Sequence, residues 1–212
     1  MKKQIFESIK GYISDNKRQY AVVIAALVAG MALGCLSALR MSGQQFESLS
    51  GYTENFVSSY NLQPVSRSRV FISSAMGNIK TVLFLWVSGL WVGLIPFAIF
   101  HIGVKGYKIG FSTAFLVSAY RGRGVLFALM SMLPQMIIFV PALTVFAVFN
   151  IRYAASIRRV RIRNGARSMR REMYLQNAVC VLGILAVVAC CSLLDAFIIP
   201  PVLKPVCSYM AA

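Results

Sequence analysis

Few residues in this 212-residue sequence could do chemistry, and their spacing assembles no catalytic set. His101 is the single histidine; it lies beside Lys105, and alone it makes neither a metal site nor a base–nucleophile pair. Asp195 is the one acidic residue within a long apolar run, so no carboxylate pair is placed for acid–base work. It lies within about one turn of the outer end of that run, so we expect a carboxylate at the outer interface and not a proton relay. No Ser/His/Asp arrangement or glycine-rich phosphate loop is present. We therefore expect no catalytic residue, no cofactor, no metal site and no enzyme activity.

The five cysteines show no metal-ligand pattern. None forms a CxxC pair and four lie in apolar runs, so we expect small, polarizable packing residues. They are Cys35, Cys180, Cys190, Cys191 and Cys207.

The elements around these residues are apolar enough for a membrane. Hydrophobic residues make up 58% of the chain and charged residues 13%, about half the share in a soluble domain. We predict an all-α, polytopic membrane bundle of five transmembrane helices. The expected spans are 21–39, 81–102, 104–120, 125–151 and 174–199. The first run is longer than the apolar h-region of a signal peptide, which has roughly 7–15 residues, and it ends without an A-x-A pattern, so we expect it to be uncleaved.

The distribution of Lys and Arg between the connecting segments predicts how these spans are oriented across the membrane. With a crossing third segment and a cytoplasmic amino terminus, inside segments hold 15 Lys and Arg and outside segments 7. This agrees with the positive-inside bias. Lys105 and Lys108 are then expected to snorkel to the inner interface. The alternative, a half-buried hairpin over 104–124, would place the arginine-rich segment 152–173 outside.

The expected organisation follows. Residues 1–20 form a basic cytoplasmic terminus, 40–80 an extracytoplasmic loop and 204–212 an extracytoplasmic tail. Residues 81–203 form a core of four spans, whose segment 152–173 lies near anionic membrane lipids. No nucleic-acid recognition fold accompanies these arginines, so we expect no nucleic acid partner.

The loop carries an apolar stripe at helical spacing. The stripe predicts a helix that either packs on its own bundle or offers an aromatic face to an extracytoplasmic partner. After Pro64, Ser66 can cap a second helix that leads into the second span. The stripe residues are Phe46, Leu49, Tyr52, Phe56 and Tyr60.

Small residues recur at four-residue spacing in three spans. They favour close helix packing within the bundle, while a partner helix or a homo-oligomer is the alternative. The pairs are Gly30 and Gly34, Gly89 and Gly93, and Gly106 and Gly110. Pro134 and Pro141 predict a bent, central fourth span. No charge is expected at the membrane midplane, which argues against a transport pathway.

The middle of the chain resembles a known family. The segment from about residue 68 to residue 203 resembles stage II sporulation protein M. The resemblance rests on the KGYKIGF element at residues 105–111, the LPQ motif at residues 133–135 and the closing segment from Asp195 to Pro200. The motif residues are Lys105, Gly106, Gly110, Phe111, Pro134, Gln135, Pro141, Asp195 and Pro200.

The resemblance implies a scaffold in forespore engulfment. Such a protein would recruit peptidoglycan hydrolases, stage II sporulation proteins P and D, at the sporulation septum in the mother-cell membrane. The family offers no catalytic residue to carry over. The rival interpretation is a transporter or ABC-type permease subunit, and a membrane-embedded enzyme is a weaker third.

Overall fold

A computed structural model describes residues 14–62, 66–162 and 167–211 of the chain, and these residues are almost entirely helical. Five of the helices are long and apolar enough to cross a membrane, as the sequence predicts. In chain order the elements are α2 (Lys17–Leu39), α3 (Gly43–Leu62), α4 (Arg67–Gly89), η1 (Val92–Leu94), α5 (Ile95–Pro134), η2 (Gln135–Phe139), α6 (Val140–Ile162) and α7 (Arg167–Ala211).

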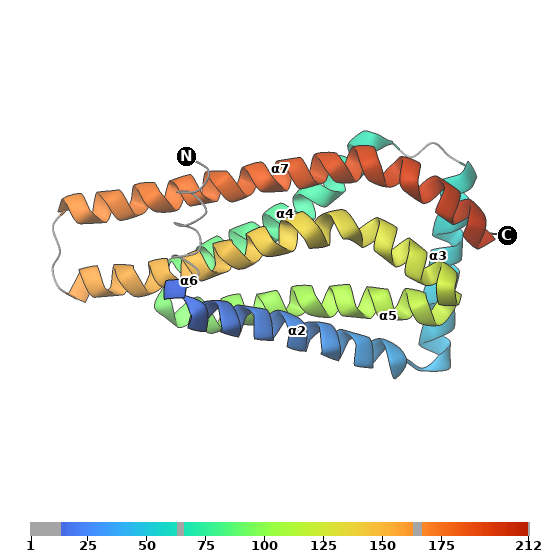
Figure 1. The fold of residues 1–212 in the computed structure, drawn as a ribbon, viewed down its shortest axis with the longest axis horizontal. Helices are drawn as coiled ribbons and strands as arrows, with labels where there is room; N and C mark the ends of the chain where they lie inside the picture. The colour runs from blue at the N-terminus through green and yellow to red at the C-terminus, as the bar shows by residue number, and fades with distance from the viewer. Residues whose placement is uncertain (1–13, 63–65, 163–166, 212) are drawn as a thin grey trace.

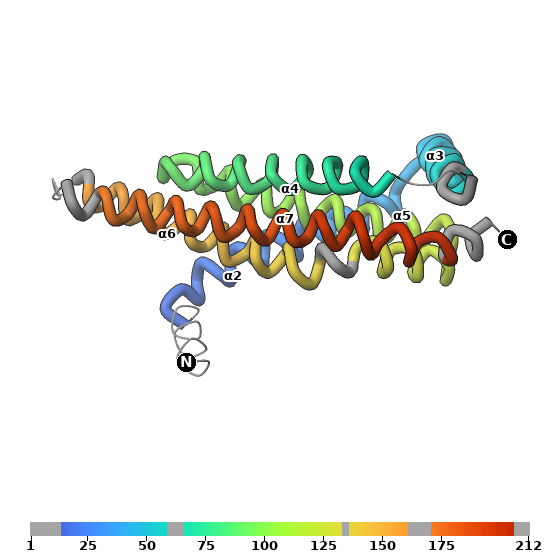
Figure 2. Tube along the Cα trace, turned by 90° about the horizontal axis from the view of Figure 1, so that it is seen from above, coloured from blue at the N-terminus to red at the C-terminus, as the bar shows by residue number. Residues whose placement is uncertain are grey.

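The long helices run along one common axis, and α3 lies across one end of the bundle (Figure 1). The start of α2 lies at the opposite end, together with the end of α6 and the start of α7. The view from above shows the same arrangement, with α4 beside the other long helices and α3 beyond them (Figure 2).

The second span differs from the prediction of 81–102. Helix α4 occupies Arg67–Gly89, and the chain then turns through η1 before α5 begins at Ile95. Pro96 is the second residue of α5, a first-turn position that tolerates proline, so it starts a helix instead of interrupting one. The sequence did not reveal this turn because its residues are as apolar as those of a span. Trp91 lies in the turn and is 67% exposed, as expected of a tryptophan at a membrane interface.

Helix α5 reverses direction at Arg121, which has a φ of 49° and a ψ of −128°. A positive φ costs energy in a residue with a Cβ, and here it separates two helical arms. We call residues 95–120 the outgoing arm and residues 122–134 the return arm. A Cβ on Gly124 would lie 1.8 Å from the Leu116 carbonyl oxygen, so glycine lets the arms meet closely. The outgoing arm runs the length of the bundle beside α2, as a crossing helix does and a half-buried hairpin over 104–124 does not (Figure 1).

The fourth span is irregular between its two prolines, as predicted. Pro134 ends the return arm, η2 forms a five-residue π-helix, and Pro141 stands in the first turn of α6. The span is also central, since it supplies much of the buried core. Those core residues are Phe139, Leu143, Phe146, Ala147 and Val148.

The fifth span continues past its predicted end at Pro200. Helix α7 runs through three internal prolines, Pro200, Pro201 and Pro205, and the predicted tail at 204–212 is part of it as far as Ala211. Leu203 is buried against the end of the bundle, so the part of the helix beyond Pro200 and Pro201 is packed on the rest of the structure. Figure 1 shows α7 bending before its carboxyl terminus.

Candidate functional site

The contact between α2 and the outgoing arm fixes the depth of Lys105. A Cβ on Gly30 would lie 2.0 Å from the Gly103 carbonyl oxygen, so these two residues stand at one level. Gly30 is the midpoint of the first apolar run, 21–39. Lys105 is two residues beyond Gly103, which places its backbone within about 3 Å of the middle of that run. The expectation of Lys105 and Lys108 at the inner interface is therefore wrong, because the outgoing arm begins at Ile95 and not at 104.

Lys105 bridges two neighbouring elements at this depth. Its Nζ donates a hydrogen bond to Oδ1 of Asn78 on α4, at 3.3 Å. The same Nζ lies 5.1 Å from the ring centroid of Phe139, which is fully buried in η2. Both contacts are uncharged, and the charged group beside Lys105 is Lys108, which has the same sign. The site therefore concentrates positive charge in the middle of the bundle.

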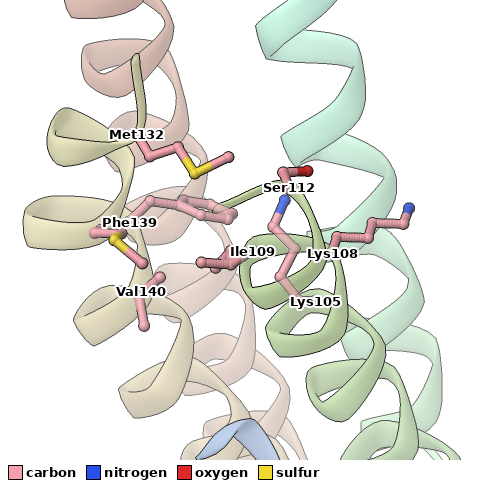
Figure 3. Close-up of a pocket in the computed structure, with 8 residues that line it drawn as sticks. Lys105, Lys108, Ile109, Ser112, Met132, Phe139 and Val140 are labelled. Carbon is pink, nitrogen blue, oxygen red and sulfur yellow. The ribbon is translucent and has the colours of Figure 1, made fainter. Parts of the chain in front are cut away.

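A cavity of about 220 Å³ opens beside these lysines. The outgoing arm contributes Lys105, Lys108, Ile109 and Ser112 to its wall. The facing wall is formed by Met132, Met136, Phe139 and Val140. Figure 3 shows Lys105 reaching along its helix toward Ser112 and the Phe139 ring, while Lys108 leaves the helix in another direction. One wall is polar and cationic, and the other is apolar and flexible.

Asp195 makes a second polar contact with α4, one turn before Asn78. The Ser74 hydroxyl donates a hydrogen bond to Oδ2 of Asp195, and the carboxylate is 1% exposed. The sequence suggested a carboxylate at the outer interface, whereas the structure buries it between α4 and α7. Ser74, Asn78 and Thr81 thus form a polar stripe on the inner face of α4.

His101 stands one turn before Lys105 on the outgoing arm. Its ring stacks on Phe84 of α4, with centroids 4.4 Å apart. Within the described residues, no three His, Cys, Asp or Glu side chains gather where a metal ion could bind. The histidine therefore contributes a ring contact between two helices.

The structure places four of the predicted glycines between α2 and α5. A Cβ on Gly34 would lie 2.2 Å from the Tyr107 carbonyl oxygen, and one on Gly106 would lie 2.2 Å from that of Leu27. Gly110 faces the Met31 carbonyl oxygen at 2.1 Å. Gly30, Gly34, Gly106 and Gly110 are all buried, so they leave no lipid-facing surface for a partner helix.

Gly89 and Gly93 do not share a helix face, because α4 ends at Gly89. A Cβ on Gly89 would lie 2.3 Å from Oδ1 of Asn150, so this glycine packs against α6. Gly93 lies in η1, where the atoms nearest to an added methyl group would belong to Trp91, at 3.7 Å.

The apolar stripe of α3 is divided between packing and exposure. Phe46 meets Phe115 edge to face at 5.6 Å, and Leu49 packs on the same cluster. Tyr52 is 81% exposed and Phe56 49% exposed. We call α3 and the reversal of α5 the end cap, which has one face on the bundle and an aromatic face turned away. The Tyr60 side chain lies outside the described residues, as does that of Gln135.

Comparison with known proteins gives one match. A family model described as "Stage II sporulation protein M" matches residues 23–200. No curated protein matches the chain, and no solved structure does.

Asn78 and the depth of Lys105 were not predicted from the sequence. The signal that could have found both is the pairing of Gly93 with Pro96, which marks a turn inside the apolar run 81–102. Moving the helix boundary to this turn would have placed Lys105 near the middle of the next helix.

Proposed function

We propose a function from one premise: the chain belongs to the stage II sporulation protein M family, whose model matches residues 23–200. With its five apolar helices, the chain is a membrane protein of a sporulation-related family. We propose that it is a scaffold without catalytic activity of its own. It holds peptidoglycan hydrolases, stage II sporulation proteins P and D, at the sporulation septum in the mother-cell membrane.

The distribution of charge supports an orientation for this scaffold. Segments 1–20 and 152–173 together carry thirteen Lys and Arg. The described parts of both segments lie at the end of the bundle away from α3 (Figure 1). The positive-inside bias favours a cytoplasmic location for that end, with the end cap and the carboxyl terminus outside. In this orientation the end cap lies on the same side of the membrane as the peptidoglycan cell wall and the hydrolases that act on it.

The observation that carries the proposal is the divided stripe of α3. Phe46 and Leu49 anchor the helix to the bundle, while Tyr52 and Phe56 face away from it. Exposed aromatic side chains on an anchored, rigid helix are typical of protein interfaces. The end cap is therefore the surface on which we place the hydrolases.

Co-purification from sporulating cells tests this surface. We expect the double variant Tyr52→Ser/Phe56→Ser to capture less of both hydrolases than the native chain, at equal membrane abundance. Phe97→Ser/Phe100→Ser is the matched control, because these exposed aromatic residues belong to α5 near the opposite end of the bundle. Equal capture by the native chain and the Tyr52/Phe56 variant would show that this surface does not recruit them.

The orientation is tested separately by labelling a single cysteine. Gly122 suits this purpose, because nothing lies within 4 Å of a Cβ placed on it. In a chain whose native cysteines are replaced, we expect Gly122→Cys to react with an impermeant thiol reagent from the extracytoplasmic side. Reaction from the cytoplasmic side alone would reverse the proposed topology.

A second function, transport, is favoured by one observation that the sequence did not predict. Lys105 lies at the midplane beside an irregular segment, and such polar groups next to broken helices are common in transporters. Purified chain in sealed vesicles would show solute flux, or a cytoplasmic ATPase would co-purify, if this function were correct. The scaffold predicts neither result.

A further inference from the structure

The lysine face of α5 is a charged surface placed in an apolar medium. We define it as Lys105, Lys108 and Ser112, which follow one another at steps of three and four residues and line the cavity. Lys108 is exposed on the outside of the bundle, three residues from the midplane level of Lys105. A cation at this depth is costly in hydrocarbon unless an opposite charge or water approaches it.

The described part of the chain offers this face little compensation. The Lys105 ammonium contacts an amide oxygen and an aromatic ring, and each of these neutral groups stabilises a cation less than a carboxylate does. The Asn78 amide is also incompletely satisfied: its buried Nδ2 has no hydrogen-bond partner among the described residues. The two lysines therefore lack an opposite charge among these contacts, and an anionic acceptor in the cavity would supply it.

The shape of the cavity narrows the choice of anion. The wall opposite the lysines consists of Met132, Met136, Phe139 and Val140, which suit an apolar chain, and methionine adapts to irregular shapes. A transmembrane helix is about 10 Å across and needs a groove along its length, whereas the cavity measures about 220 Å³. Part of a single acyl chain beside a charged head fits this volume better.

We propose that this cavity is a binding site for an anionic phospholipid. The lipid phosphate lies against Lys105, Lys108 and Ser112, and part of one acyl chain lies along the Met132 and Met136 side. Ser112 is nine residues beyond Gly103, which places it about 13 Å from the middle of the first apolar run, near the edge of a hydrocarbon core about 30 Å thick. Lys105 extends toward Ser112 (Figure 3), so a lipid phosphate at this edge can approach both lysines and offset the cost of keeping them within the membrane. The site is independent of the hydrolase-docking surface, which lies on α3.

Native mass spectrometry of the purified full chain tests the site. The probes are phosphatidylglycerol and phosphatidylcholine, added at equal concentration to the protein in a mild non-ionic detergent. We expect the native chain to retain phosphatidylglycerol at least severalfold more than phosphatidylcholine. Lys108→Met and Lys105→Met should each abolish this preference. Lys108 is the safer position, because its side chain is exposed and its removal leaves the Asn78 contact intact.

Lys80→Met is the matched control. Lys80 is also an exposed lysine, it stands two residues from Asn78 on α4, and it does not line the cavity. The proposal requires that Lys80→Met keep the lipid preference. An equal loss in Lys80→Met and Lys108→Met would reduce the effect to general surface charge and overturn the site.

Two further outcomes would also overturn it. Displacement of the bound lipid by millimolar inorganic phosphate would show a site for a free anion and not for a lipid. The other is that the native chain retains no lipid and instead holds a protein that is lost in Lys108→Met. That result would assign the lysines to a partner's transmembrane helix.

Discussion

Two faces of α5 meet their neighbours in opposite ways. On one face Gly103, Gly106 and Gly110 let the backbone of α2 approach so closely that an added Cβ on Gly106 or Gly110 would meet a carbonyl oxygen near 2 Å. On another face the long side chain of Lys105 reaches α4 through a hydrogen bond to Asn78, and a cavity opens beside it. We call these the glycine face and the lysine face.

The difference shows which contacts build the bundle and which are available for function. In lipid, apolar burial gives helices little reason to associate, so close backbone packing is a main source of stability. The glycine face supplies that packing and leaves no space. The lysine face holds its neighbour through polar atoms at a greater distance, and the remaining volume can accept a ligand.

The comparison would fail most clearly if the glycine face tolerated a methyl group. Gly110→Ala should lower the free energy of unfolding by about 3 kcal/mol, because the new Cβ meets the Met31 backbone, which cannot rotate away. Unfolding of the purified chain by SDS in mixed micelles measures this change.

Gly183→Ala is the control for that substitution. It lies within α7, nothing stands within 4 Å of its added Cβ, and alanine favours a helix over glycine by about 0.5 kcal/mol or more. A loss below about 1 kcal/mol in Gly110→Ala would mean that the two helices separate easily, and the glycine face would not be the rigid one.

The lysine face is expected to contribute less energy per contact. A double-mutant cycle of Asn78→Leu and Lys105→Met should give a coupling of about 1 kcal/mol, the usual order for interhelical hydrogen bonds in membranes. The matched neutral pair is Trp86 and Asn177, whose Nε1 and Oδ1 atoms are 3.1 Å apart.

The cycle with Trp86→Phe and Asn177→Leu should show a smaller coupling, since neither partner is charged. A coupling near zero for Asn78 and Lys105 would leave the lysine without a structural tie to α4. The cavity would then have a movable wall.

The sequence predicted the number of apolar helices and the helix within residues 40–80, because long apolar runs and periodic stripes are local patterns. It placed the boundary of α4 wrongly, because the turn around Trp91 is as apolar as the helices that it joins. The depth of Lys105 depended on this boundary and was wrong for the same reason.

The end of α7 and the division of the α3 stripe depend on tertiary contacts. Pro200 is a helix breaker by its local chemistry, yet the helix continues past it to a position where Leu203 is buried by residues distant in the sequence. Likewise, Phe46 and Tyr52 belong to one apolar stripe, and Phe46 is the one that packs on Phe115 while Tyr52 stays exposed.

The smallest expected effect is a difference between the two faces in how the lipid changes the free energy of unfolding. In phosphatidylcholine bicelles, Lys108→Met should raise the free energy of unfolding by up to about 1 kcal/mol, since it removes an exposed cation from apolar surroundings. In phosphatidylglycerol bicelles the gain should disappear or change sign, because the native lysine then has a phosphate to bind. Gly110→Ala should lose the same free energy in both lipids, since its clash lies between two backbones that no lipid reaches. Equal responses of Lys108→Met in the two lipids would remove the distinction between a structural face and a ligand-binding face on this helix.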